Sequence, residues 1–136
     1  MDEVLRAEVR QRAGNRCEYC GLAQSALPFA SFHVDHIIAV QHGGSDELPN
    51  RALCCSRCNF SKGPNLSGFD NETGAIVPLF HPRNDKWHDH FEYQRAYIMG
   101  RTSTGRVTVQ VLNMNEDRRV KLRASLLQTR RPRRNP

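Results

Sequence analysis

Two pairs of cysteines have the spacing that lets neighbouring thiolates bind one metal ion. Cys17 and Cys20 form the first C-x-x-C pair, and Cys55 and Cys58 form the second. Each pair makes a tight knuckle, and two knuckles together supply the four thiolates of a closed tetrahedral zinc site. A closed site has no open coordination position, so this zinc is predicted to be structural rather than catalytic. The alternative is a set of four reduced, buried cysteines without a metal.

The other cysteine and the first residues of the chain indicate the compartment. The chain has five cysteines, and this odd number argues against a framework of disulfide bonds. Cys54 fits the metal pattern less well, because with Cys58 it would form a C-x-x-x-C pair. Residues 1–12 mix acids with arginines and lack the apolar core of a secretory signal. No run approaches the roughly 20 apolar residues of a membrane span. We therefore expect reduced thiols and a cytoplasmic protein without a membrane partner.

A second group of residues has the chemistry to hydrolyse a phosphodiester bond. That reaction needs a base to activate water and a cation to stabilise charge on the phosphate and the leaving oxygen. His36 suits the base, because a neutral imidazole accepts a proton near pH 7. Asp35 offers an anionic oxygen and Asn59 a neutral one, and both suit a hard Mg²⁺ or Mn²⁺ ion. Neighbouring residues on a strand point to opposite faces, so the strand that carries Asp35 and His36 is expected to end or bulge there.

The order of these residues resembles the HNH endonuclease family, which has the ββα-metal (His-Me finger) fold. The resemblance covers residues 15–64, and it is closest to the subgroup whose finger is braced by two C-x-x-C pairs. It implies that His36 is the general base, that Asp35 and Asn59 hold the catalytic ion, and that Asn50 ties the loop to the finger. The motifs that carry it are Phe32-His-Val-Asp-His-Ile-Ile38, Gly43-Gly44, Asn50 and Cys58-Asn-Phe-Ser-Lys-Gly63.

The chain departs from the usual pattern of this family at three positions. Asn59 stands where the third signature residue is often histidine, a variant that favours an oxygen-ligated ion. Ala39 stands where proline often follows the Asp-His-Ile run, and Arg51 follows Asn50 where leucine is usual. These changes remove no catalytic group, although the last two would alter the rigidity of the loop.

Two further residues near the motif have open roles. His33 lies two residues before Asp35, on the same strand face if the strand is regular, and is a candidate for contact with phosphate or metal. A packed structural histidine is the alternative. Lys62 is a candidate phosphate contact, and a lysine that extends along the surface is the competing interpretation.

The excess positive charge is confined to the C-terminal part. The whole chain has a formal net charge of +6, yet residues 1–100 hold 10 Lys+Arg and 12 Asp+Glu, against 10 and 2 in residues 101–136. This asymmetry favours a polyanionic partner, although a solvated basic helix would have the same composition. Duplex DNA with weak sequence preference is the predicted partner, RNA is an open alternative, and the oligomeric state is left open. The candidate contacts, besides Lys62, are Arg118, Arg119, Lys121, Arg123, Arg130 and Arg131.

The elements that must position these residues can be predicted in outline. The fold class is α+β: a ββα-metal core braced by the zinc site, followed by a C-terminal strand and a basic helix. We expect residues 1–100 to form the nuclease domain and residues 101–136 the C-terminal part. The predicted elements are a helix over 2–13, a strand pair over 29–40, a loop over 41–49, a short strand over 51–54, a short helix over 56–62, an apolar run over 76–80, a strand over 106–112 from the alternation of Val107, Val109 and Val111, and a helix over 116–128 capped by Asn115.

The sequence therefore predicts a metal-dependent DNA endonuclease with a one-metal mechanism. The competing hypothesis is a non-catalytic, zinc-containing DNA-binding module. The joint presence of Asp35, His36 and Asn59 argues against that module, because binding alone needs none of them.

Overall fold

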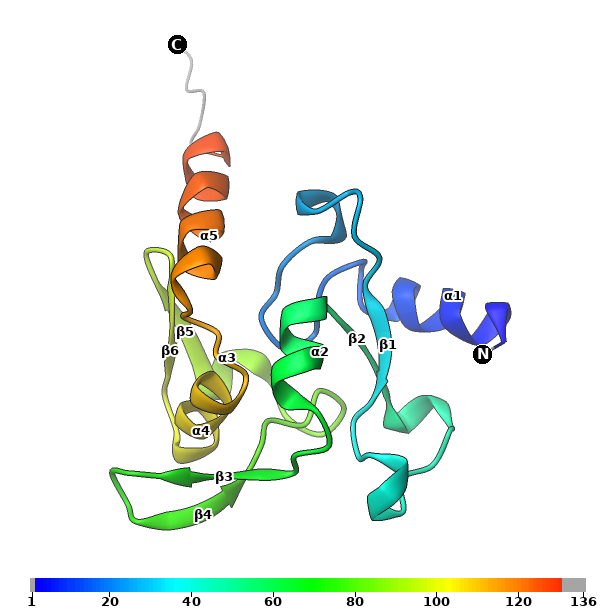
Figure 1. Cartoon of the computed structure of the whole chain (residues 1–136), viewed down its shortest axis with the longest axis horizontal. Coiled ribbons are helices and arrows are strands. Elements are labelled where there is room, and N and C mark those ends of the chain that lie inside the picture. The colour runs from blue at the N-terminus through cyan, green and yellow to red at the C-terminus, as the bar shows by residue number, and fades with distance from the viewer. Residues whose placement is uncertain (1, 131–136) are drawn as a thin grey trace.

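The computed structural model describes residues 2–130, in which short helices alternate with two-stranded sheets (Figure 1). No helix within that span is long and apolar enough to cross a membrane. The elements, in chain order, are α1 (Glu3–Arg12), η1 (Gln24–Ala26), β1 (His33–His36), η2 (Val40–His42), η3 (Leu48–Asn50), β2 (Arg51–Cys54), α2 (Ser56–Lys62), β3 (Ser67–Asp70), β4 (Ala75–Pro78), α3 (Trp87–His90), β5 (Phe91–Gln94), β6 (Tyr97–Gly100), α4 (Ser103–Val111) and α5 (Asp117–Arg130).

A ββα unit forms the centre of the molecule and confirms the predicted α+β class. β1 pairs with β2 in antiparallel register, with Asp35 opposite Ala52 and His36 opposite Arg51. α2 begins immediately after β2 and contacts β1, while α1 contacts both strands. Every residue of β2 is buried, so this strand is the inner element of the unit.

The expected strand pair over residues 29–40 is wrong, because only β1 is a strand there and its partner is β2. The chain leaves the sheet after His36. At Ile38 its backbone hydrogen bonds go to the side chain of Asn50 instead of to the backbone of β2. The Ile38 N–H donates to Asn50 Oδ1 at 2.9 Å, and Asn50 Nδ2 donates back to the Ile38 carbonyl at 2.9 Å. Gly44 approaches that carbonyl so closely that a Cβ atom would collide with it. Residues 37–50 therefore form a tight loop that connects β1 to β2.

The predicted C-terminal strand over residues 106–112 is also wrong, because this segment lies in α4. The Thr102 hydroxyl caps the helix by accepting a hydrogen bond from the Gly105 N–H at 3.0 Å. Val107 and Val111 are four residues apart and share one helix face, so the valine spacing suits a helix as well as a strand. That face contacts Gly68 of β3, and α4 also contacts β4 and β6. Packing against these strands outweighs the strand preference of the valines.

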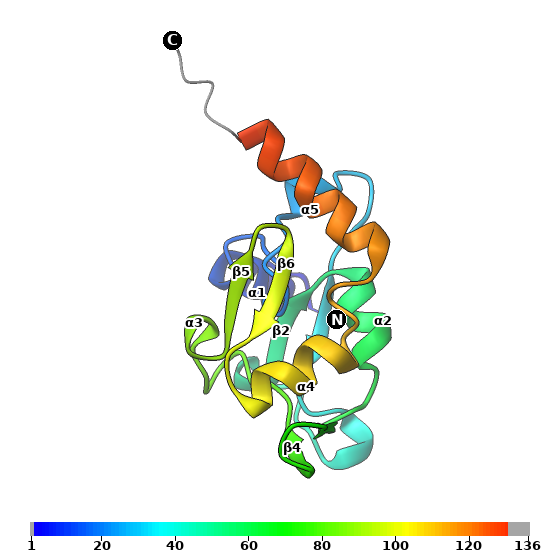
Figure 2. The same cartoon turned by 90° about the vertical axis from the view of Figure 1, so that its left-hand side faces the viewer.

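The predicted C-terminal helix is confirmed as α5, with shifted ends and without the predicted cap. Asn115 holds β6 instead: its Oδ1 accepts from the Ile98 N–H at 2.9 Å, and its Nδ2 donates to the Ile98 carbonyl at 2.8 Å. α5 extends away from the ββα unit in both views (Figures 1 and 2). The proposed division between residues 100 and 101 stays a prediction.

Candidate active site and metal centre

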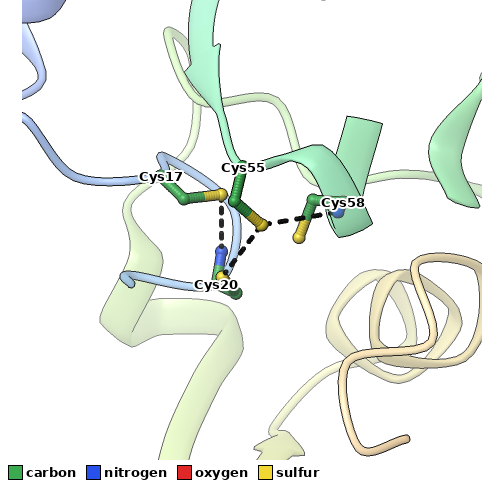
Figure 3. A group of neighbouring side chains, drawn as sticks. All are labelled: Cys17, Cys20, Cys55 and Cys58. Atoms are coloured by element: carbon green, nitrogen blue, oxygen red, sulfur yellow. Dashed lines mark hydrogen bonds between the residues drawn. The ribbon is translucent and has the colours of Figure 1, made fainter. Parts of the chain in front are cut away.

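Four cysteines from two distant segments meet in the interior beside α2 (Figure 3). Cys17 and Cys20 lie in a turn after α1, whereas Cys55 caps the N-terminus of α2 and Cys58 lies in its first turn. All four side chains are buried, and their Sγ atoms lie within 4.8 Å of one another. The predicted four-cysteine set is confirmed.

The spacing of the sulfur atoms suits a zinc ion. Zn–S bonds near 2.3 Å in a tetrahedron place neighbouring sulfurs about 3.8 Å apart. Cys20 Sγ and Cys55 Sγ are 3.8 Å apart. The Cys20 N–H donates to Cys17 Sγ at 3.5 Å, and the Cys58 N–H donates to Cys55 Sγ at 3.4 Å, as thiolate acceptors require. Cys54 is buried and free but lies outside the cluster, in agreement with the prediction from spacing.

Arg119 faces this cluster rather than solvent, so its predicted role as a DNA contact is wrong. Its Nη2 donates to Cys58 Sγ at 2.9 Å and lies 4.0 Å from Cys55 Sγ. Its Nη1 donates to the Leu112 carbonyl at 2.7 Å. Burial by itself would lower the pKa of Arg119, but the charge of Cys58 and then Cys20 raises it. The four cysteines could hold zinc. Four thiolates with one Zn²⁺ would sum to −2, and such a buried charge needs a partner like Arg119.

Arg123, the second arginine assigned to DNA, is largely engaged within the fold. Its Nε donates to the Ala96 carbonyl at 2.6 Å, and its Nη2 donates to the Met114 carbonyl at 2.7 Å and to Asn115 Oδ1 at 3.0 Å. The guanidinium thus fastens α5 to the β5–β6 turn through Nε and Nη2, and the contact of Arg123 with DNA stays a prediction.

The remaining basic residues of the C-terminal part differ in where they lie. Arg118 and Lys121 are exposed on α5, and Arg130 ends that helix. Their contact with DNA stays a prediction. Arg131 lies outside the described residues.

Asp35 points toward α2, where it meets a buried lysine. Asp35 Oδ2 lies 3.6 Å from Lys62 Nζ, and the Lys62 side chain is only 2% exposed. Lys62 also donates to the carbonyl of Ile37 at 3.0 Å and lies 3.4 Å from the carbonyl of His36. The interpretation of Lys62 as a lysine that extends along the surface is therefore wrong, because Lys62 holds the end of β1 against α2. Its contact with phosphate stays a prediction. Burial raises the pKa of the Asp35 carboxyl, and the positive charge of Lys62 opposes that rise.

His36 contacts an acid that sequence reasoning missed. Its Nε2 lies 2.8 Å from Asp46 Oδ1 in the β1–β2 loop. Arg51 holds this acid, since its Nε donates to the Asp46 carbonyl at 3.1 Å and its Nη2 lies 3.5 Å from Asp46 Oδ1. The hydrogen bond with His36 lowers the pKa of Asp46. Arg51 itself was the available signal, because a charged residue in an otherwise apolar strand needs a carboxylate partner.

Asp35 and His36 lie on opposite faces of β1, as their adjacency predicts. The strand ends at His36 without a bulge, which agrees with the expected end there.

Asn59 lies on α2 one helical turn before Lys62, the residue that contacts Asp35. Its side-chain amide is half-buried and makes no hydrogen bond to any residue in 2–130. The side chain of His33 is exposed, and its predicted contact with phosphate or metal stays a prediction.

Asn50 holds the loop in place. Besides its two bonds with Ile38, its Nδ2 donates to the Ser45 carbonyl at 2.7 Å. The Ile37 N–H donates to the Asn50 carbonyl at 2.8 Å and so extends the β1–β2 pairing by one bond. The role that the resemblance implied for Asn50, a tie between loop and finger, matches these bonds. Asn50 therefore positions the end of β1 where His36 lies.

Comparison with known proteins finds a family model that matches the central unit. Residues 17–65 match the family model described as HNH endonuclease. The matched span contains both cysteine knuckles, β1, β2 and α2. No curated protein and no solved structure matches the chain.

Proposed function

From the match of residues 17–65 to the HNH endonuclease family model, we propose that the chain is a metal-dependent DNA endonuclease. The observation that carries the proposal is the placement of three residues on the ββα unit. Asp35 and His36 end β1, and Asn59 lies on the helix that packs against this strand. The family acts on nucleic acid, and the basic C-terminal part supports DNA as the form that is cut.

Asp35 and Asn59 are the residues that would hold a Mg²⁺ or Mn²⁺ ion. When bound, such an ion stabilises negative charge on the scissile phosphate and on the leaving oxygen. The Asp35 carboxylate is 18% exposed and pairs only loosely with Lys62, at 3.6 Å. The Asn59 amide has no protein partner among the described residues, so its oxygen is free to bind an ion. A carboxylate with a neutral amide oxygen is a donor set that suits a hard ion.

The first test concerns Asn59. Its side chain makes no hydrogen bond within residues 2–130, so its removal leaves no other group without a partner. We expect Asn59→Ala to raise the Mg²⁺ concentration for half-maximal cleavage about tenfold or more, because one ligand of the ion is removed. Asn65→Ala, an exposed asparagine just after α2, is the matched control and should leave that concentration unchanged. The measurement is the cleavage rate of a labelled duplex against Mg²⁺ concentration. Equal curves for the two variants would remove Asn59 from the ion site.

His36 would act as the general base through its Nδ1 atom. A carboxylate without a proton can only accept a hydrogen bond, so the 2.8 Å contact with Asp46 places the imidazole proton on Nε2. The neutral ring then has its lone pair on Nδ1, where it can accept a proton from water. Asp46 would therefore fix both the tautomer and the ring orientation of His36, and Arg51 would hold Asp46 in place.

The second test separates Asp46 from other acids of the loop. We expect Asp46→Ala to lower kcat by about tenfold without a comparable change in KM, the cost of one charge-assisted hydrogen bond at an exposed position. Asp46→Asn should recover most of the rate, because its amide oxygen still accepts from Nε2. Glu47→Ala removes the same charge from the neighbouring residue and is the control. If Asp46→Ala and Glu47→Ala have the same kcat, Asp46 does not position His36.

A further inference from the structure

A hollow of about 720 Å³ lies beside the metal centre, between the first cysteine knuckle, the β5–β6 turn and α5. Its lining is a set that includes Arg16, Leu22, Ser25, Tyr93, Arg95 and Arg123. None of the residues in the matched motif at the end of β1 belongs to this set, so the hollow is separate from the proposed catalytic site.

The lining of this hollow, which we call the arginine pocket, is strongly basic. Three guanidinium groups come to it from three separate segments: Arg16 from the knuckle, Arg95 from the β5–β6 turn and Arg123 from α5. No aspartate or glutamate lines it. The thiolate of Cys20 is the one other charged group there, and it belongs to the cluster that Arg119 faces. The arginine pocket therefore favours an anion.

The three arginines differ in how far they are free to bind a ligand. Arg16 donates one hydrogen bond, from Nη1 to the Gly21 carbonyl at 3.0 Å. Arg123 uses Nε and Nη2 within the fold, which leaves Nη1 without a partner among residues 2–130. Arg95 is exposed, and within the same span its side chain makes no hydrogen bond or ion pair. Arg95 lies at a φ of 56°, a left-handed conformation that non-glycine residues rarely adopt, at the tip of the turn.

Most of the remaining lining is apolar, and the hollow is larger than a bare phosphate needs. Leu22, Leu126 and Leu127 contribute aliphatic walls, and the Tyr93 ring contributes an aromatic one. Tyr93 is fixed, because its hydroxyl donates to the Cys20 carbonyl at 3.2 Å and its ring packs on Trp87 with centroids 5.1 Å apart. A ligand with a phosphate and an adjoining flat or apolar group matches such a surface.

We propose that the arginine pocket binds an unpaired nucleotide of the nucleic-acid substrate, with its phosphate on the arginines and its base or sugar against the apolar walls. This inference rests on the proposed function, since it assumes that nucleic acid is the substrate. A nucleotide that is stacked within a duplex cannot enter a hollow, whereas an unpaired one can. The pocket would therefore give the chain affinity for single-stranded regions, at a distance from His36.

The test introduces a carboxylate into the pocket from two different walls. Arg95→Glu reverses a charge on an exposed side chain, and glutamate strains the left-handed turn no more than arginine does. Ser25→Glu adds a charge from η1, a different segment of the lining, and removes no arginine. The control is Arg101→Glu, which makes the same charge change at an exposed arginine outside the pocket. Zinc content and circular dichroism of each full-length variant show whether the fold is intact.

The measurement is the anisotropy of a fluorescein-labelled single-stranded oligonucleotide, titrated with zinc-loaded protein at several salt concentrations without added Mg²⁺. We expect each pocket variant to weaken binding about tenfold or more, and Arg101→Glu to weaken it by a few fold at most. For Arg95→Glu the slope of log K against log salt should become shallower by about 0.7 for each phosphate that the variant no longer neutralises.

The possible outcomes distinguish this inference from the proposed function. If the pocket variants and Arg101→Glu bind the oligonucleotide equally well while the unchanged protein cleaves DNA, the pocket inference alone is overturned. If the unchanged protein neither binds nor cleaves DNA, both are overturned. Weaker binding confined to the two pocket variants supports the inference.

Discussion

Replacement of His36 by alanine is expected to lower the rate of DNA cleavage by roughly 100- to 10,000-fold, the usual contribution of a general base. The mutation should leave zinc content and DNA affinity unchanged. The His36 side chain is 26% exposed, and its one side-chain partner within the described span is Asp46, which is 79% exposed. Neither residue belongs to the hydrophobic core, so the fall in rate would not reflect unfolding.

A matched histidine in the same loop provides the control. His42 is exposed and ends η2, and the structure gives its side chain no contact with Asp35, His36 or Asn59. His42→Ala should therefore cleave DNA at close to the rate of the unchanged protein in a single-turnover assay. A His36→Ala variant that cleaves as fast as His42→Ala would show that His36 is not the base.

Removal of a cysteine ligand is expected to have the largest effect on stability. We expect Cys58→Ser to abolish zinc binding and the cooperative thermal transition of the chain. The apparent binding free energy of a structural zinc site is about 10–16 kcal/mol, which equals or exceeds the roughly 5–15 kcal/mol stability of a whole domain. In this protein the cluster joins the first knuckle to the start of α2, and Arg119 connects it to α5. Without the ion, Arg119 would also face a serine hydroxyl instead of a thiolate.

Cys54→Ser is the control, because Cys54 is equally buried but lies outside the cluster. It should retain one zinc ion per chain and melt cooperatively, with a modest decrease in stability from the buried hydroxyl. The measurements are zinc content by atomic absorption and thermal unfolding by circular dichroism. The structural role of the cluster would be refuted by a Cys58→Ser variant that unfolds cooperatively at the temperature of Cys54→Ser.

The parts of the site that could be predicted are those fixed by spacing within short segments. The C-x-x-C spacing alone identified all four members of the cluster, because a knuckle places its two thiolates side by side whatever the rest of the fold does. The order of Asp35, His36 and Asn59 likewise identified the ββα unit. These predictions needed no knowledge of how distant segments pack.

The incorrect predictions concern residues whose role depends on distant partners. Arg119 was assigned to DNA from the charge of its segment, yet it is buried and faces Cys58. Lys62 was expected at the surface, but it is buried beside Asp35. A count of net charge treats such residues as free to bind a partner. In the fold they pair with buried anions and donate hydrogen bonds to carbonyl groups.

The helix α4 illustrates the same limit for secondary structure. Alternating valines at 107, 109 and 111 predicted a strand, and valine does favour strands. Two features favour a helix over a strand in this segment. Thr102 caps it, and at Gly105 the backbone approaches His90 too closely for a side chain. The close approach at Gly105 can be recognised only when the positions of His90 and of Gly100 in β6 are known.

The most direct test of the central claim is the conversion of supercoiled plasmid to nicked circles by the zinc-loaded chain as Mg²⁺ is raised from none. We expect nicking to depend on Mg²⁺, to saturate with it and to be absent in a parallel series with His36→Ala. The contradictory result would be a chain that holds its zinc and retards the plasmid on a gel, yet nicks it at no concentration of Mg²⁺ or Mn²⁺. Such a chain would be a DNA-binding module rather than a nuclease.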